Sequence, residues 1–89
     1  MQEQHLEIIN RLGLHARAAA KFSTTASRFN CQIKVQCQGK TVNGKSIMGL
    51  MMLAAARGTL IQITLDGSDE NEALDALTVL IGNRFGEVE

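Results

Sequence analysis

The chain lacks several features that would place it in particular protein classes. Its 89 residues include no proline, no tryptophan, no tyrosine and only 3 phenylalanines. No apolar run approaches the roughly 18 residues of a membrane span, and the polar start, Met1 to His5, lacks the basic-then-apolar pattern of a secretory signal. We therefore expect a cytoplasmic protein with no membrane insertion.

Cysteine is also scarce, with only Cys31 and Cys37 present. Both lie in an alternating segment and would point to the same strand face, some 20 Å apart. That separation is too large for a disulfide, and the spacing is not that of a zinc site. The two histidines add no credible metal cluster to these thiols, and His5 is predicted to be a strand-edge residue without chemistry. We predict buried free thiols, no metal ion and no cofactor.

Neither sign of charge dominates overall, but the signs are separated along the chain. Residues 1–58 carry eight Lys or Arg against two Glu, a net +6, whereas residues 59–89 carry one Arg against seven acids, a net −6. A basic front part suggests an anionic partner, although the charges could simply solvate different helices. A nucleic-acid domain would also need aromatic stacking platforms, and the three phenylalanines do not supply them. We expect no nucleic-acid partner.

The periodicity of apolar residues predicts four strands and three helices. Strands are expected at 6–8, 31–37, 40–42 and 60–65, with a tight turn at Gln38-Gly39 between the second and third. Helices are expected from 16 to about 29, over 47–56 and from about 69 to 81. This order predicts a two-layer α+β fold with an antiparallel sheet and helices on one face, in a single domain spanning residues 1–89.

Several helix ends carry cap signals. His15 would occupy the N-cap of the first helix, and the Ser46 hydroxyl can cap the second. Gly58 stands where a left-handed C-terminal residue would. Asp69, with Glu72 three residues on, resembles a capping box for the last helix.

The start of the first helix, within the stretch RLGLHARAAAKF, combines a histidine with an arginine. If the helix begins at Ala16, the N–H groups of Ala16, Arg17 and Ala18 lack intrahelical partners and favour an anion. A phosphoryl group on a nucleophilic His15 would lie within reach of these donors and of the Arg17 guanidinium. By residue type alone, the pair could equally be a surface histidine beside a solvated arginine.

The surrounding residues resemble known signatures. GLHARAAAKF resembles the active-site signature of the HPr family, the histidine-containing phosphocarrier proteins of the phosphoenolpyruvate-dependent phosphotransferase system. GKSIMGLMMLAA, residues 44–55, resembles the second signature of that family. The resemblance extends over the whole chain and implies the open-faced βαββαβα sandwich, with three helices on one face of a four-stranded antiparallel sheet.

The resemblance implies a phosphocarrier and not an enzyme. His15 would be phosphorylated on Nδ1 by phosphorylated enzyme I and would pass the group to an EIIA-type domain, while Arg17 steadies the phosphate. The chain offers no P-loop, metal cluster or second general acid or base for catalysis of its own. A diffusing carrier favours a monomer.

One residue departs from the commonest family pattern. Many members have proline at the position of Ala18, where it would preset the first helical turn. The alanine-containing loop is similar to members that serve incomplete or nitrogen-related phosphotransferase chains, which end on regulatory proteins. Regulation through partner binding therefore stays open as an alternative to sugar uptake.

The second signature implies a regulatory site and a docking patch. Many HPr proteins are phosphorylated at the serine matching Ser46 by an HPr kinase/phosphorylase, although a plain N-cap is the other possibility. The family residues that match Ile47, Met48 and Met51 form an exposed apolar patch beside the histidine. Because apolar residues nearly encircle the 47–56 helix, core filling is the alternative for its methionines.

Overall fold

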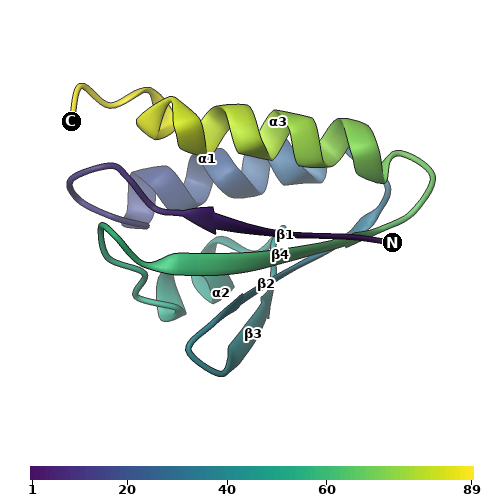
Figure 1. The fold of residues 1–89 in the computed structure, drawn as a ribbon, viewed down its shortest axis with the longest axis horizontal. Coiled ribbons are helices and arrows are strands. Elements are labelled where there is room, and N and C mark those ends of the chain that lie inside the picture. Colours follow the sequence, from purple (N-terminus) through teal and green to yellow (C-terminus); the bar gives the residue numbers. More distant parts are fainter.

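The structure, a computed structural model, describes residues 1–89. Four strands and three helices follow one another in the predicted order (Figure 1). The strands are β1 Gln2–Glu7, β2 Gln32–Cys37, β3 Lys40–Asn43 and β4 Leu60–Asp66. The helices are α1 Ala16–Ser27, α2 Ile47–Met52 and α3 Glu70–Gly82, followed by the short 3-10 helix η1 Arg84–Gly86.

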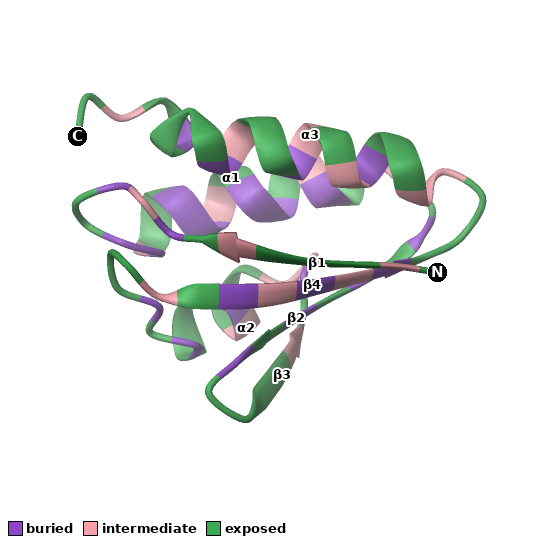
Figure 2. Cartoon of the chain, viewed as in Figure 1, coloured by how far each residue is buried: buried purple, intermediate pink, exposed green.

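The four strands form one antiparallel sheet in the order β1-β4-β2-β3. Strands β2 and β4 alternate strictly, with Ile33, Val35, Ile61 and Ile63 buried on one face (Figure 2). Helices α1 and α3 lie side by side along the sheet, and α2 lies near β2 and β3 (Figure 1). The predicted α+β fold, with three helices and a four-stranded antiparallel sheet, is confirmed.

Helix α1 shows how the sequence specifies this packing. Its buried residues recur at helical spacing, and the largest of them, Phe22, is fully buried against the sheet layer. Burying one such aromatic side chain contributes about 2–3 kcal/mol. Cys31 and Cys37 are buried and free, as predicted. None of the helices combines the length and the hydropathy that a membrane span requires.

Strand β1 is longer than the predicted 6–8, and α2 is shorter than the predicted 47–56. The first residues of β1 are polar, so they gave no alternation, but backbone pairing with β4 extends the strand to Gln2. Helix α2 ends because Ala54 has a positive φ of 51° and Ala55 is drawn into the core. The Ala55 carbonyl accepts a hydrogen bond from Leu14 N–H at 2.8 Å, so the chain leaves the helix to support the loop before α1.

The predicted capping box at Asp69 is wrong. Asp69 is the N-cap residue of α3, but its side chain makes no cap hydrogen bond. Its carboxylate instead accepts from the N–H groups of Asn30 at 2.7 Å and Cys31 at 2.9 Å, which ties the α1–β2 connection to α3. These hydrogen bonds, that from Asn30 foremost, hold the pKa of Asp69 below its ordinary value. Gly58 is left-handed, as predicted, but it follows a turn and not the end of a helix.

Candidate functional site

Three segments that are distant in sequence meet at one end of the molecule. The loop between β1 and α1, the connection from α2 to β4 and the segment after α3 all lie at the left of Figure 1. His15 stands there as the N-cap of α1, with an extended backbone, as the sequence predicted. Its carbonyl accepts the first intrahelical hydrogen bond, from Ala19 N–H at 2.8 Å. The backbone donors at this helix end are therefore those of residues 16–18.

The loop before His15 is fixed by a close backbone approach. Gly13 has a positive φ of 70°, and a Cβ at this position would lie 2.6 Å from the Ala55 carbonyl oxygen. The same oxygen accepts the hydrogen bond from Leu14 N–H. Only glycine fits here without a shift of the backbone. The turn after α2 thus determines where His15 is held.

Glu87, which the sequence analysis missed, contacts the His15 side chain. Its Oε2 lies within hydrogen-bond distance of His15 Nε2, and its Oε1 accepts from Asn10 Nδ2 at 3.0 Å. The fully buried Asn10 also donates to the Gly13 carbonyl at 2.7 Å, whereas its own Oδ1 has no protein partner. The side chains of His15 and Glu87 are only 26% and 16% exposed. A single carboxylate therefore links the histidine to the loop that precedes it.

The charge on Glu87 determines which imidazole nitrogen is free. Burial alone would raise the pKa of Glu87, but hydrogen bonds from Asn10 and His15 outweigh it and hold this pKa below its ordinary value. The carboxylate is therefore ionised near neutral pH and can only accept a hydrogen bond. Nε2 of His15 must carry the hydrogen, so in the neutral imidazole the lone pair lies on Nδ1. The hydrogen-bond network thus leaves Nδ1 as the ring nitrogen with a free lone pair.

A left-handed turn directs Glu87 to this position. Arg84, Phe85 and Gly86 have φ values of 56°, 55° and 78°. For a residue other than glycine this conformation costs roughly 1–2 kcal/mol. Phe85 is held in it because its ring is buried in the core and its carbonyl accepts from Lys21 Nζ at 2.6 Å. The strained turn ends the helical segment and places residues 87–89 beside the loop before α1, where Glu87 contacts Asn10 and Glu89 contacts Arg11.

His15 and Glu87 line one open pocket of about 780 Å³. Its lining brings together three predicted site residues, His15, Ala16 and Arg17, with the segment 87–89. Arg17 is exposed, and its guanidinium forms none of the ion pairs of the chain, so it is available to an anion in the pocket. The remaining lining residues are Arg11 and Leu12.

Ser46 and the residues after it occupy the N-terminal end of α2. The Ser46 hydroxyl accepts from Gly49 N–H at 3.0 Å, so the predicted N-cap is confirmed. The preceding carbonyl, that of Lys45, accepts from Ser23 Oγ at 2.7 Å and ties this end to α1. Three predicted patch residues are exposed, at 42%, 69% and 40% for Ile47, Met48 and Met51. Core filling is thus wrong for these side chains, because only Leu50 of α2 is buried.

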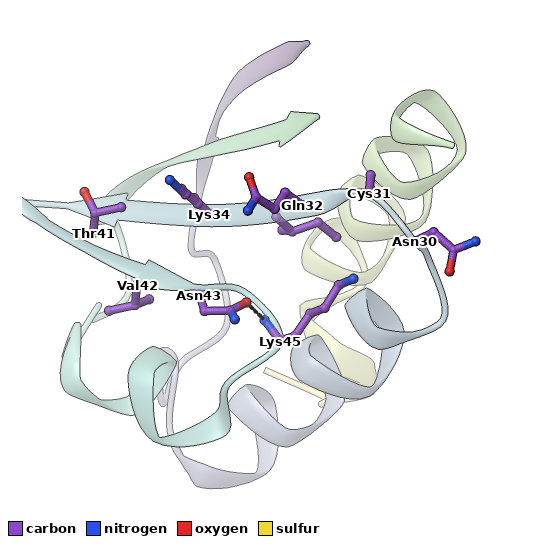
Figure 3. A pocket seen from close by; sticks show the side chains of 9 residues that line it. Asn30, Cys31, Gln32, Lys34, Thr41, Val42, Asn43 and Lys45 are labelled. Atoms are coloured by element: carbon purple, nitrogen blue, oxygen red, sulfur yellow. Dashed lines mark hydrogen bonds between the residues drawn. The ribbon is translucent and has the colours of Figure 1, made fainter. Parts of the chain in front are cut away.

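A second pocket, of about 430 Å³, lies between β2, β3 and the end of α1 (Figure 3). Two lysines, Lys34 and Lys45, line it. Lys45 is engaged, because its Nζ donates to the Phe29 carbonyl at 2.7 Å and its backbone N–H donates to Asn43 Oδ1 at 2.9 Å. Burial, together with Asp69, raises the pKa of the Cys31 thiol at its rim. This pocket therefore contains no activated nucleophile. No group of three potential metal ligands occurs in the chain.

Comparison with known proteins decides the family. The family model described as the PTS HPr component phosphorylation site matches residues 2–83. The chain belongs to the HPr family. This HPr protein is a phosphocarrier of the phosphotransferase system and not an enzyme that turns over a small molecule.

Individual relatives match this HPr chain over its full length. The phosphocarrier protein HPr of Neisseria meningitidis is 60% identical over 89 residues, with 100% of both chains covered. A crystal structure of HPr from Thermoanaerobacter tengcongensis matches with a TM-score of 0.96 and 48% identity, again over 100% of both chains. A structure described as an HPr dimer from the same organism matches with a TM-score of 0.79 and 49% identity, over 98% of this chain and 100% of that chain.

Proposed function

We propose that this HPr protein accepts a phosphoryl group on Nδ1 of His15 from phosphorylated enzyme I and passes it to a histidine of an EIIA-type domain. The observation that carries the proposal is the contact between His15 Nε2 and the Glu87 carboxylate, because it leaves the Nδ1 lone pair free. In the forward step this lone pair forms a bond to phosphorus while the bond from phosphorus to the donor nitrogen breaks. The donor imidazole keeps that electron pair.

The groups around His15 fit the charges that develop during transfer. As Nδ1 bonds to phosphorus, the ring becomes more positive, and the ionised Glu87 beside Nε2 compensates this charge. The phosphoryl oxygens would be stabilised by the N–H groups of Ala16, Arg17 and Ala18 and by the Arg17 guanidinium. The carboxylate would thus act at Nε2, while the helix end would act on the phosphoryl group attached to Nδ1.

Partner docking is assigned to the exposed residues Ile47, Met48 and Met51. Flexible thioethers suit a surface that must meet enzyme I and several EIIA-type domains in turn. Arg11 and Arg17, at the neighbouring pocket, would attract acidic partner surfaces. We assign the encounter to the cytoplasm and to a monomer, which leaves this face free, although a relative is described as a dimer.

Ser46 is proposed as a regulatory phosphorylation site for an HPr kinase/phosphorylase. Its hydroxyl already lies at the N-terminus of α2, where a phosphate is tolerated by the fold. The modification adds about −1.5 to −2 charges beside the docking residues. We expect it to weaken the association with an acidic enzyme I. An association constant unchanged by Ser46→Asp or by true phosphorylation would contradict this role.

Intact-mass analysis tests the carrier function directly. The protein is incubated with enzyme I, magnesium and phosphoenolpyruvate, and the wild type is compared with His15→Ala. One acid-labile phosphoryl group is expected on the wild type and none on the variant. An unchanged wild-type mass, with an enzyme I that phosphorylates another HPr in the same assay, would overturn the proposal.

A further inference from the structure

A third pocket, of about 550 Å³, lies beside the His15 pocket and gathers three arginines. Arg11 comes from the loop after β1, Arg57 from the connection between α2 and β4, and Arg84 from the left-handed turn after α3. The lining is completed by Ile9, Val88 and Glu89. The two pockets share Arg11, Val88 and Glu89, so the segment 88–89 is their common wall.

The charges of this pocket are only partly compensated. Glu89 is the single carboxylate in the lining, and its Oε2 pairs with Arg11 Nη1 at 2.9 Å. The guanidinium groups of Arg57 and Arg84 form no ion pair. Three separate loops thus place three cations around one hollow that contains one anion. Such an arrangement raises the local concentration of anions.

Glu89 also shows which kind of group the pocket accepts. Its side chain binds the Arg11 guanidinium, and its carbonyl accepts a hydrogen bond from the Arg11 backbone N–H. An oxygen anion, the Glu89 carboxylate, is therefore already bound at one edge of the pocket, where it would compete with an added anion for Arg11. A carboxylate can satisfy one guanidinium fork, whereas a phosphate monoester has three terminal oxygens and nearly two charges. The volume falls in the range of about 300–1,000 Å³ that is typical of small-molecule sites.

We propose that Arg11, Arg57 and Arg84 form a second anion site, which binds a small phosphate monoester and in doing so releases Glu89 from Arg11. The binding step stands on the pocket alone. Its consequence rests on the proposed function: once Glu89 is released, the segment that holds Glu87 against His15 loses the side-chain ion pair with Arg11 that helps to hold it. A bound phosphate ester would then slow phosphoryl transfer at His15.

A titration with glycerol 3-phosphate, followed by amide chemical shifts at constant ionic strength, tests the binding. Saturable shifts are expected at Arg57, Arg84 and Val88. The double variant Arg57→Gln/Arg84→Asn is expected to bind at least about tenfold more weakly, since it loses two charge-assisted contacts with the ester. Asparagine is chosen at position 84 because it tolerates the left-handed backbone.

A matched control separates the site from general electrostatics. The variant Lys34→Gln/Lys40→Gln removes the same charge from two exposed positions, on β2 and β3, and should bind as the wild type does. Equal binding by the two double variants would overturn the proposal. So would shifts confined to residues 16–18, because the phosphate would then bind at the start of α1.

The coupling to His15 needs a second readout. Glu89→Gln removes the competitor and should tighten glycerol 3-phosphate binding. In the intact-mass assay, phosphorylation of the wild type should slow as the ester saturates, and the Arg57→Gln/Arg84→Asn variant should be insensitive. If the wild type binds the ester with no change in rate, the coupling is wrong. If His15 takes no phosphoryl group at all, the carrier function fails while the titration still decides the site.

Discussion

His15 and Ser46 are both N-cap residues with extended backbones, but they use their side chains in opposite ways. Ser46 turns its hydroxyl inward and satisfies Gly49 N–H, which closes the start of α2. His15 turns its imidazole away, toward Glu87, and leaves the first N–H groups of α1 without a side-chain partner. One helix start is stabilised by its own cap. The other is kept available for an anion and must be held in place by more distant residues.

The largest effect is expected where those distant residues hold the His15 loop. Gly13→Ala combines a left-handed backbone with a Cβ 2.6 Å from the Ala55 carbonyl oxygen, so the free energy of unfolding should fall by about 2–4 kcal/mol. Gly39→Ala is the matched control, because Gly39 is also left-handed but has no atom within 4 Å of the added Cβ. Urea denaturation measures both. Equal losses would show that the contact with Ala55 does not constrain the loop.

The second prediction breaks the contact that turns the imidazole away from the helix. Glu87→Gln replaces a pure acceptor with an amide that can also donate, so both His15 tautomers become populated. Phosphorylation by enzyme I should slow by about tenfold, since part of the imidazole lacks the lone pair on Nδ1 and the ring also loses the carboxylate that compensates its developing positive charge. Ring ¹⁵N chemical shifts of His15 should report the tautomer mixture directly. Glu7→Gln, at an exposed carboxylate of β1, should change neither quantity.

The third prediction compares the two caps themselves. Ser46→Ala should lower the free energy of unfolding by about 1 kcal/mol, because Gly49 N–H loses its acceptor. His15→Ala should cost less than Ser46→Ala, because the imidazole caps nothing and only its contact with Glu87 is lost. Thermal or urea unfolding of the two variants checks the difference. A loss at His15 as large as that at Ser46 would mean that the imidazole stabilises the helix start after all.

The sequence predicts helix caps and turns well, because they depend on neighbouring residues, but it predicts contacts between residues far apart in the chain poorly. Both N-caps and the turn at Gln38-Gly39 follow from residue types within a few positions of each other. Glu87 lies 72 residues from His15, and no spacing rule connects them. The early end of α2 has the same origin. Ala55 lies among good helix formers, but it is placed outside the helix, where its carbonyl packs against the distant Gly13.

The wrong prediction of a capping box at Asp69 shows that even a matching local signal can fail. Asp69 is at the N-cap, as the local pattern predicts, but its carboxylate accepts hydrogen bonds from the N–H groups of Asn30 and Cys31 instead of from its own helix. A local signal states what a side chain can do at its own helix end. It does not state which of several unpaired donors the folded chain will bring closer. Both Asp69 and Glu87 are carboxylates whose partners come from another part of the chain.

The smallest effect is the pH dependence that these two carboxylates share. Their pKa values are lowered from ordinary values of 3.8 for Asp69 and 4.5 for Glu87, so each stabilises the fold fully above its unfolded value. That contribution is lost as the pH falls through the folded value, because the protonated acid no longer accepts its hydrogen bonds. Urea midpoints measured between pH 6 and pH 3 should therefore fall less steeply for Asp69→Asn and Glu87→Gln than for the wild type. If Glu87→Gln alone retained the wild-type slope, the His15 end would be held by Asn10 and the left-handed turn without help from the charge on Glu87.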